Sequence, residues 1–359
     1  MKIAIVGGGT GGHISPAIAV AQAVWKQQPE ADVQFICTPR PVDRRMYAPY
    51  SERLHVTDPP RIDKGPAGIA LFPFRAAGAL IRSRALLSKL QPDVLFATGG
   101  YPSFFPLLAA KFKKLPSLIH ESNSIAGRAN RIAARFTGEV LTGFRSAEKS
   151  FRCPVTFTGN PVRLSMKKYT RDEAREKLKI PKDKKTVLML GGSQGASAMN
   201  DLAAGVSEDL QLLLQCGSRH TDTMKQRFRD MPNTRVIGFT DDPGLLYSAA
   251  DIAVARSGAM TVAELTWFRV PAFYVPYPYA ADDHQRWNAR DAAESGGAFT
   301  RIQDRIVPEE LWLEIIQLLK DEKRLTGMRE KLQQLMPRNP AFLIAEAVME
   351  RAEGGRGRD

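Results

Sequence analysis

The sequence predicts an α/β protein with two Rossmann-like, doubly wound domains that face each other across a cleft. An apolar segment followed by a glycine loop and a helix-forming segment occurs twice, from residue 3 and again from residue 186. This order is typical of open parallel sheets, which bind ligands at the carboxyl ends of their strands. The length of 359 residues fits two domains of roughly 100–200 residues each. We expect domains over residues 1–160 and 161–340, and a last helix over 341–353 that packs back on the first domain.

The composition is that of a globular protein with a large positive charge. Hydrophobic residues make up 43% and charged residues 25% of the chain, and the net charge is +13. Such an excess favours a polyanionic partner: nucleic acid, an anionic membrane or a phosphate-rich substrate. We expect no nucleic-acid partner, because basic residues are not interleaved with aromatic residues and no helix-turn-helix or zinc-finger spacing is present.

The cysteine pattern and the apolar segments bear on the cellular compartment. Cys37, Cys153 and Cys216 are far apart and form no Cys-x-x-Cys pair, so they favour a reducing compartment over a disulfide framework or a metal site. The apolar segment at residues 3–6 is too short for a signal peptide, and no segment reaches the length of about 18 apolar residues that a membrane span needs. We therefore expect a cytoplasmic protein.

The first half begins with a strand at residues 3–6, a glycine loop and a helix over about residues 16–27. Three glycines of the loop satisfy the G-x-G-x-x-G pattern of dinucleotide-binding folds: Gly7, Gly9 and Gly12. The next strand, residues 33–37, does not end in the acidic residue that binds the ribose of NAD. This argues against NAD, whereas Arg40 leaves NADP open.

A proline- and arginine-rich stretch, residues 38–65, predicts a loop with short elements. The segment after it mixes apolar and basic residues. Its apolar members are Ile69, Leu71, Phe72, Phe74, Leu80 and Ile81, and its basic members are Arg75, Arg82, Arg84 and Lys89. An apolar face with a basic rim suits an anionic membrane surface. The alternative is an ordinary helix that packs on the sheet and exposes a solvated face.

Further strands complete both halves. In the first half we expect strands at residues 94–97, 118–120, 139–142 and 155–157, with a linker beginning at 159–163. In the second half we expect strands at residues 186–190, 212–216, 235–237, 252–255 and 272–275, helices from residue 308, and a frayed tail at 354–359. Several strands end in glycine or polar loops, which is how a site is built along one edge of a parallel sheet.

A phosphate site is predicted where the strand at residues 252–255 ends. A helix is expected to open at Thr261, and Gly258 just before it lets backbone N–H groups approach an anion at the positive end of the helix dipole. A diphosphate would lie along Ser257, Gly258, Ala259, Met260 and Thr261. Glu264, one turn into the helix, is close enough to accept hydrogen bonds from a ribose.

A second polar helix start follows the strand at residues 272–275. Its polar residues, expected to contact a sugar, are Asp282, Asp283, His284 and Gln285. Both helix starts also have a simpler interpretation, because Thr261-x-x-Glu264 is a capping box and Asp282-x-x-Gln285 is nearly one. In that case the acidic and amide side chains only close helix ends.

Seven motifs occur in order along nearly the whole chain. They are GGGTGGH at 7–13, GGY-x-S at 99–103, HE-x-N at 120–123, GNPVR at 159–163, GGSQGA at 191–196, RSGAMTVAE at 256–264 and DDHQ-x-x-N at 282–288. With them the chain resembles the MurG family, N-acetylglucosaminyltransferases of the GT-B fold that convert lipid I to lipid II in peptidoglycan synthesis. The resemblance implies inverting transfer from UDP-N-acetylglucosamine to the C4 hydroxyl of the muramoyl sugar of a lipid-linked muramoyl-pentapeptide. It also implies an acceptor- and membrane-facing first domain, a donor-binding second domain, and a place on the cytoplasmic face of the inner membrane.

The resemblance also assigns roles to individual residues. Thr10, Gly11 and Gly12 match the loop that meets the donor sugar and the acceptor diphosphate. Positions that match donor contacts are Asn123, Arg163, Ser193 and Gln285, with Gln194 and His284 in the same motifs. Thr240 matches a residue whose backbone holds uracil, Glu264 matches the ribose-binding glutamate, and Tyr101 and Asn200 match positions tied to activity. Two departures concern the acceptor side: Ser122 replaces a common Gln, and Phe104-Phe105 replace smaller residues.

The chemistry implied by the resemblance requires charge stabilisation and a base. Negative charge builds on the departing UDP, and a basic chain with two helix N-termini can stabilise it. Since the sequence has no D-x-D pair, we expect no metal and no cofactor. His13 is the first candidate for the base that accepts the acceptor's hydroxyl proton, and Glu121 is the second. A histidine beside a helix start can equally have a structural role.

Two other classes of function stay open at this point. One is an NADP-dependent oxidoreductase that uses the first glycine loop. The other is a non-catalytic protein of the same fold that binds lipid phosphates or acts as a scaffold. Among glycosyltransferases, the alternative is another UDP-sugar-dependent enzyme of the GT-B fold that acts on a lipid acceptor.

Overall fold

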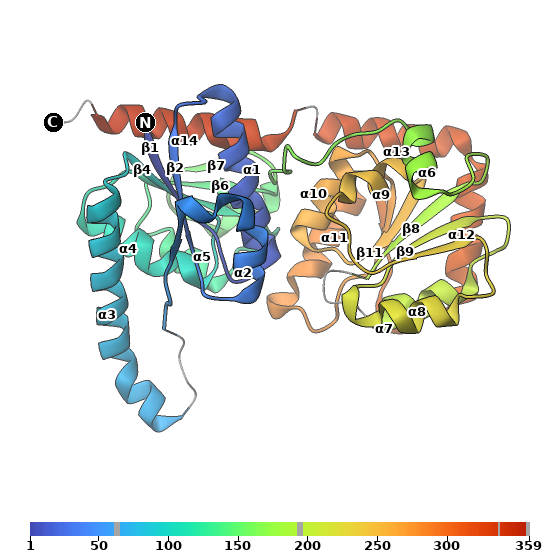
Figure 1. Cartoon of the computed structure of the whole chain (residues 1–359), viewed down its shortest axis with the longest axis horizontal. Coiled ribbons are helices and arrows are strands. Elements are labelled where there is room, and N and C mark those ends of the chain that lie inside the picture. Colours follow the sequence, from blue (N-terminus) through green and yellow to red (C-terminus); the bar gives the residue numbers. More distant parts are fainter. Residues whose placement is uncertain (61–64, 192–196, 337, 357–359) are drawn as a thin grey trace. The chain divides into compact units, whose positions relative to one another are not determined.

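The computed structural model describes residues 1–60, 65–191, 197–336 and 338–356. The chain forms two compact units, which we call unit 1, Met1–Leu164 with Arg338–Asp359, and unit 2, Ser165–Pro337. The first unit thus ends four residues later than the boundary we expected at residue 160. Each unit is a parallel β-sheet covered by helices (Figure 1).

Unit 1 contains a seven-stranded sheet in the order β3-β2-β1-β4-β5-β6-β7, with all neighbouring strands parallel. Its strands are β1 (Lys2–Val6), β2 (Asp32–Cys37), β3 (Leu54–Val56), β4 (Val94–Ala97), β5 (Ser117–Glu121), β6 (Glu139–Thr142) and β7 (Val155–Phe157). The central strands are apolar along their whole length because helices bury both faces of a parallel sheet. Every residue of β4 and β5 is accordingly buried.

The helices of unit 1 follow the strands in the doubly wound pattern. They are α1 (Gly11–Gln27), α2 (Pro41–Met46), α3 (Pro66–Leu90), α4 (Phe104–Phe112), α5 (Arg128–Ala133) and α14 (Pro340–Arg356). Short 3-10 turns lie at η1 (Ala48–Arg53), η2 (Tyr101–Ser103) and η3 (Arg145–Ser150). Although α14 is the last helix of the chain, its buried face, which includes Ile344 and Val348, packs in the core of unit 1 with residues of α1. Asn339 fixes its start, because its Nδ2 donates to the Val162 carbonyl at 2.7 Å.

Unit 2 repeats this plan with a six-stranded parallel sheet in the order β10-β9-β8-β11-β12-β13. Its strands are β8 (Thr186–Leu190), β9 (Gln211–Gln215), β10 (Thr234–Ile237), β11 (Ile252–Ala255), β12 (Ala272–Tyr274) and β13 (Ala298–Thr300). Its helices are α6 (Arg171–Leu178), α7 (Ser197–Leu202), α8 (Thr221–Arg227), α9 (Pro243–Ala249), α10 (Ala259–Trp267), α11 (His284–Glu294), α12 (Pro308–Lys320) and α13 (Glu322–Leu335). Further 3-10 turns are η4 (Ala203–Gly205), η5 (Ser218–His220), η6 (Ala281–Asp283) and η7 (Gln303–Arg305).

The strand order places a topological switch point in each sheet. In unit 1 the order reverses between β1 and β4, and in unit 2 it reverses between β8 and β11. Open α/β sheets bind ligands in the crevice outside the carboxyl ends of such strands. The predicted α/β fold of two doubly wound domains is therefore confirmed, and the loops to inspect are those that follow these strands.

Two strands were not expected from the sequence. β3 and β13 are edge strands of three residues each. Their extended conformation comes from parallel pairing with β2 and β12. Tertiary pairing therefore decides their structure.

The mixed apolar and basic segment forms α3, a helix with two different halves. In its second half Ala79, Ser83 and Leu87 are spaced four residues apart and are buried. In residues 68–78 no side chain is buried. The first half of α3 extends away from the sheet of unit 1 (Figure 1).

Candidate active site

In unit 1 the loop after β1 and the loop after β4 meet at the switch point. The hydroxyl of Thr98, which follows β4, donates to the backbone carbonyl of His13 at 2.7 Å. Gly9, Gly99 and Gly100 have φ angles of +85°, +88° and +78°, a left-handed region that glycine adopts without steric cost. The glycines of both motifs therefore let two loops approach each other closely.

His13 lies in the first turn of α1 with its imidazole against the loop after β4. Its Nδ1 is 3.0 Å from the hydroxyl of Thr10, and a Cβ atom on Gly100 would lie only 2.9 Å from the imidazole Cε1. Desolvation lowers the pKa of His13 to about 4, and the Asp43 carboxylate raises this pKa by a smaller amount. The ring is therefore neutral at neutral pH, and its Nε2 makes no hydrogen bond to the described residues. A neutral imidazole with an unoccupied nitrogen can accept a proton.

Glu121, the second candidate for the base, has its carboxylate occupied by its own loop. Oε1 accepts hydrogen bonds from the backbone N–H and from Nδ2 of Asn123 at 2.8 and 3.2 Å. Oε2 accepts from the backbone N–H of Gly127 at 3.0 Å and from Nδ2 of Asn130 at 2.7 Å. Burial raises the pKa of Glu121, and these hydrogen bonds oppose the rise. The geometry fits a side chain that organises the loop after β5, with Asn123 in it, better than one that takes a proton from a substrate.

Asn130 and Tyr101 make further contacts between the segments that follow β1, β4 and β5. Oδ1 of Asn130 accepts a hydrogen bond from the backbone N–H of Gly100 at 2.9 Å, which joins the loop after β4 to α5. The half-buried ring of Tyr101 lies against Gly9, where a Cβ would be 3.1 Å from it, and the Arg40 guanidinium carbon is 5.8 Å from its centroid. Thr10, Gly11, Gly12, His13, Tyr101, Glu121 and Asn123 thus all lie at the carboxyl ends of β1, β4 and β5, in the loops there or in the first turn of the helix that follows.

Arg163 follows the GNP sequence at the end of unit 1. Its side chain is half-buried, and its Nε is buried without a hydrogen-bond partner among the described residues. Buried donors are normally satisfied. An unsatisfied guanidinium nitrogen therefore indicates a place for a ligand or for water.

In unit 2 the helix after β11 begins two residues earlier than expected, at Ala259, with Gly258 as its N-cap residue. Thr261 consequently lies inside the first turn, and no side chain caps this end. The carboxylate of Glu264 instead accepts a hydrogen bond from the Tyr247 hydroxyl at 2.6 Å. The capping-box interpretation of Thr261 and Glu264 is therefore wrong. The first turn, from Ala259 through Met260 to Thr261, presents backbone N–H groups at the positive end of the helix dipole.

The start of α11 is tied to this turn. The Ser257 hydroxyl donates to the backbone carbonyl of Gln285 at 2.7 Å, and Nδ2 of Asn288 donates to the Ser257 carbonyl at 3.1 Å. Oε1 of Gln285 accepts from the backbone N–H of Tyr277 at 3.0 Å, and Nδ1 of His284 donates to the Ala281 carbonyl at 2.7 Å. No side chain caps α11, so the near-capping interpretation of Gln285 is also wrong. The Gln285 Nε2 has no partner among the described residues and is available to a ligand.

The remaining expected donor residues lie in other loops of unit 2. The Thr240 hydroxyl accepts from the backbone N–H of Asp242 at 3.1 Å, which fixes the turn between β10 and α9. Asn200 on α7 is 1% exposed, and both polar atoms of its side chain lack hydrogen-bond partners among the described residues. Ser193 and Gln194 lie outside the described residues.

Two family models match the chain in order. The N-terminal domain of glycosyltransferase family 28 matches residues 3–142, and the C-terminal domain of that family matches residues 186–339.

The chain belongs to glycosyltransferase family 28.

Two curated relatives of this family 28 chain carry the name UDP-N-acetylglucosamine--N-acetylmuramyl-(pentapeptide) pyrophosphoryl-undecaprenol N-acetylglucosamine transferase. The relative from Acetivibrio thermocellus is 32% identical over 361 residues, which cover 98% of each chain. The relative from Salinibacter ruber is 34% identical and covers 98% of this chain and 97% of its own. Among solved structures, MurG of Acinetobacter baumannii has a TM-score of 0.78 at 28% identity and covers 97% of this chain and 99% of its own. UDP-GlcNAc 2-epimerase of Neisseria meningitidis, at 14% identity and a TM-score of 0.64, shares the fold.

Membership of family 28 decides between the classes of function left open by the glycine pattern. The G-x-G-x-x-G pattern at residues 7–12 belongs to a glycosyltransferase domain. The oxidoreductase alternative was also based on Arg40, whose guanidinium Nη1 donates to the Gly9 carbonyl at 2.6 Å. The position of Arg40 is thus explained by its hydrogen bond to the first glycine loop.

Several residues that shape the site were missed in the sequence. Asp43 on α2 and Tyr47 at the end of α2 both form hydrogen bonds to the first glycine loop. Tyr247 on α9 donates a hydrogen bond to Glu264. Arg256 donates to the carbonyls of Val275 and Pro276 at 3.0 and 3.2 Å and so ties the loop after β11 to the one after β12. These pairs are 17 to 40 residues apart in the chain, and nothing in the local pattern indicates them.

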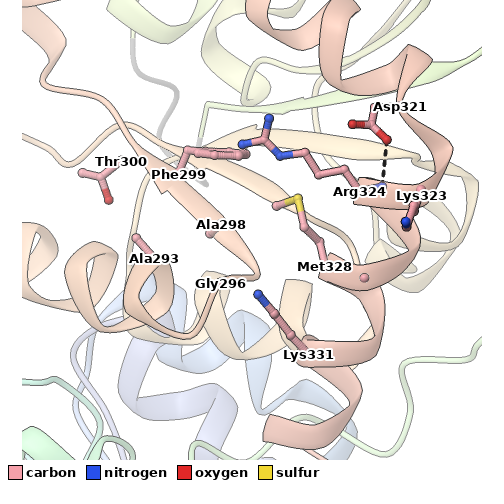
Figure 2. A pocket seen from close by; sticks show the side chains of 11 residues that line it. Ala293, Gly296, Ala298, Phe299, Thr300, Asp321, Lys323, Arg324, Met328 and Lys331 are labelled. Atoms are coloured by element: carbon pink, nitrogen blue, oxygen red, sulfur yellow. Dashed lines mark hydrogen bonds between the residues drawn. The ribbon is translucent and has the colours of Figure 1, made fainter.

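A cavity of about 740 Å³ lies elsewhere in unit 2, at the edge strand β13 and beside α13. In Figure 2 Lys331 points toward Gly296, and Arg324 lies along Phe299. Lys323 adds a third basic side chain to its lining, and none of the expected donor residues lines it. This cavity is therefore separate from the residues that we expect to bind the donor.

Proposed function

We propose that this family 28 glycosyltransferase transfers N-acetylglucosamine from UDP-N-acetylglucosamine to the C4 hydroxyl of the muramoyl sugar of lipid I, with inversion, and so makes lipid II for peptidoglycan synthesis. The observation that carries the proposal is near full-length similarity to relatives named for this transfer, at 32% and 34% identity. The motif residues of the described chain also lie at or after the carboxyl ends of the strands, in the loops and in the helices that follow them. The product would serve cell-wall biogenesis and, through it, cell shape and division.

The donor is proposed to bind unit 2. The diphosphate would lie at the first turn of α10, where backbone N–H groups and the helix dipole favour an anion. Glu264, held by Tyr247 at 2.6 Å, would accept hydrogen bonds from the ribose hydroxyls. Gln285 would contact the sugar through its Nε2, and the backbone of Thr240 would hold the uracil.

The acceptor is proposed to bind the glycine loops of unit 1, with His13 as the base. The C4 hydroxyl would lose its proton to the Nε2 of His13 as its oxygen attacks the anomeric carbon and the bond to UDP breaks. Asn123 and Arg163 would add contacts to the donor. The helix N-terminus at α10 would stabilise the charge that develops on UDP, because oriented N–H groups in a dry site interact strongly with a developing anion.

Titration calorimetry with nucleotide sugars, combined with a transfer assay, tests this function. We expect UDP-N-acetylglucosamine and UDP to bind, ADP-ribose and NADPH not to bind, and UDP to be released only when a lipid-linked muramoyl acceptor is present. Donor binding without acceptor-dependent UDP release would instead support the non-catalytic alternative.

Replacing Gln285 with alanine is expected to weaken the selectivity for N-acetylglucosamine over glucose in the donor. The loss of one neutral hydrogen bond corresponds to roughly 0.5–1.5 kcal/mol, so the ratio of kcat/KM for the two donors should fall about 3- to 10-fold. Competition kinetics with UDP-N-acetylglucosamine and UDP-glucose measure this ratio. Arg286→Ala, at an exposed neighbouring position on α11, is the matched control, and an unchanged ratio in Gln285→Ala would place the sugar contact elsewhere.

The enzyme is also proposed to work as a peripheral protein on the anionic, cytoplasmic face of the inner membrane, where a lipid-linked acceptor resides. Among the described residues no helix is long and apolar enough to cross a bilayer. The first half of α3 supports the proposal, because its apolar side chains Ile69, Leu71 and Phe74 are 58%, 48% and 76% exposed. Leu80, which we grouped with them, packs against the core of unit 1 instead.

Membrane binding by α3 is expected to depend on salt. Four exposed basic residues of α3 would each gain about 1 kcal/mol near an anionic surface: Arg75, Arg82, Arg84 and Lys89. Co-sedimentation with anionic vesicles should fall as salt rises through roughly 0.1–0.5 M, because the Debye length shortens. Binding to zwitterionic vesicles should be weak.

Serine at Phe72 and Phe74 is expected to lower activity on a vesicle-embedded acceptor while preserving activity on a short-chain soluble acceptor. Phe74 is 76% exposed and Phe72 is half-buried, so Phe74→Ser alone should carry most of the effect. Leu313→Ser, which changes a side chain of unit 2 that is 58% exposed, is the control. Equal losses on both acceptors would show that the phenylalanines act in folding and not at the membrane.

A further inference from the structure

The peptide groups of Gly9 are held from both sides by one short segment of the chain. Both carboxylate oxygens of Asp43 accept from the Gly9 N–H at 3.0 Å, and Nη1 of Arg40 donates to the Gly9 carbonyl at 2.6 Å. Gly9 has a φ of +85°. A glycine in this region has no side chain to restrict its backbone, so the conformation depends on these contacts.

Asp43 is built into the fold as a fully buried acceptor. It is 0% exposed, and its Oδ2 also accepts from the backbone N–H and the hydroxyl of Thr38, both at 2.8 Å. A side chain at Gly8 would clash with this oxygen, because a Cβ atom there would lie 2.6 Å from it. Tyr47, four residues after Asp43, donates from its hydroxyl to the Gly7 carbonyl at 2.8 Å. Three consecutive glycines are thus in contact with the segment that contains α2.

Gly9 directly precedes Thr10, the residue whose hydroxyl contacts the imidazole of His13. Thr10 is the N-cap residue of α1, but its side chain makes no capping hydrogen bond. Its hydroxyl is instead 3.0 Å from Nδ1 of His13. The orientation of the peptide between Gly9 and Thr10 therefore determines where this hydroxyl lies, and the hydroxyl in turn orients the imidazole.

We propose that Arg40 and Asp43 are positioning residues for the transfer reaction, which clamp Gly9 so that Thr10 holds His13 with its Nε2 toward the acceptor hydroxyl. Neither residue needs to touch the substrate. Arg40 acts a second time through Tyr101, because its guanidinium carbon lies 5.8 Å from the centroid of that ring. The inference rests on the proposed function of His13 as the base.

The size of the effect follows from the sensitivity of proton transfer to geometry. A displacement of about 1 Å at a reacting group can cost about 10²-fold in rate. We expect Arg40→Gln to lower kcat about 10-fold and Asp43→Asn to lower it about 10- to 100-fold, because the amide of asparagine places a donor opposite the N–H groups of Gly9 and Thr38. Arg40→Lys should recover most of the loss, since an ammonium group can still donate to the Gly9 carbonyl.

A double-mutant cycle with His13→Asn separates positioning from simple stabilisation of the fold. If the clamp acts through His13, Arg40→Gln and Asp43→Asn should lower kcat less than about threefold in the His13→Asn background, because residues that act as a unit are not additive. Independent structural damage would multiply the losses. Donor affinity by calorimetry should be unchanged in all variants, since the donor is proposed to bind unit 2.

Arg44→Gln is the matched control, because Arg44 is exposed on the same helix and should leave kcat unchanged. Because Asp43 is buried, the melting temperature of Asp43→Asn must first show that this variant is folded. If it is not folded, Arg40→Gln decides the test, because Arg40 is only half-buried. Wild-type kcat in Arg40→Gln, or fully multiplicative losses with His13→Asn, would overturn the proposal. A wild-type enzyme that binds donor but transfers no sugar would instead overturn the proposed function.

Discussion

Asparagine in place of His13 is expected to lower turnover by roughly 10² to 10⁴, the usual contribution of general base catalysis. Asparagine can still hydrogen-bond to Thr10 but has no nitrogen that accepts a proton at neutral pH. The donor is proposed to bind unit 2, so its affinity by calorimetry should be nearly unchanged. Near-normal turnover would move the role of the base to another group.

The pH dependence provides a second readout for His13. Burial lowers its pKa to about 4, so the neutral base is lost as pH falls through about 4, and the acid limb of kcat/KM, which reports the free enzyme, should lie there. An acceptor diphosphate next to the ring favours the imidazolium, so the acid limb of kcat should lie at higher pH. His55→Asn on β3, which is not in the loops of the site, is the control and should keep both limbs.

Alanine at Glu264 is expected to raise KM for the donor about 10- to 100-fold with little change in kcat. Hydrogen bonds to a charged acceptor contribute roughly 1.5–3 kcal/mol, and a ribose contact is made equally in the ground state and the transition state. Steady-state kinetics with varied donor, together with UDP calorimetry, measure the change.

The controls for Glu264 use the contact that fixes it. Tyr247→Phe removes the hydroxyl that donates to Glu264 at 2.6 Å, so it should raise KM by less than Glu264→Ala does. Glu309→Ala, at an exposed position on α12, should leave KM unchanged. Unaltered UDP affinity in Glu264→Ala would show that this glutamate serves only the packing of α9 and α10.

Some features of the site follow from short stretches of sequence because the physical cause is local. Continuous apolar strands such as β4 and β11 are recognisable, since both faces of a central parallel strand are buried. The glycines of the loop after β1 and of the loop after β4 are recognisable for a similar reason, because close loop packing and positive φ angles exclude side chains. The resemblance to the MurG family likewise rests on motifs shorter than ten residues.

Other features depended on where helices begin and which loops meet. Glu264 is no capping residue because α10 starts at Ala259, a difference of two residues that a sequence pattern cannot resolve. Glu121 was the second candidate for the base after His13, and Gly127 and Asn130, up to nine residues further along the chain, donate hydrogen bonds to its carboxylate.

The sequence alone therefore determined the α/β class, the repeated strand, loop and helix plan, and the loops in which we propose the site. Only the tertiary structure decided the edge strands β3 and β13, the clamp on Gly9 and the partner of Glu264. The reason is that these depend on contacts between segments distant in the chain. Asp43 lies 34 residues from Gly9, and a buried carboxylate finds its hydrogen-bond donors only when the sheet brings β2 beside β1.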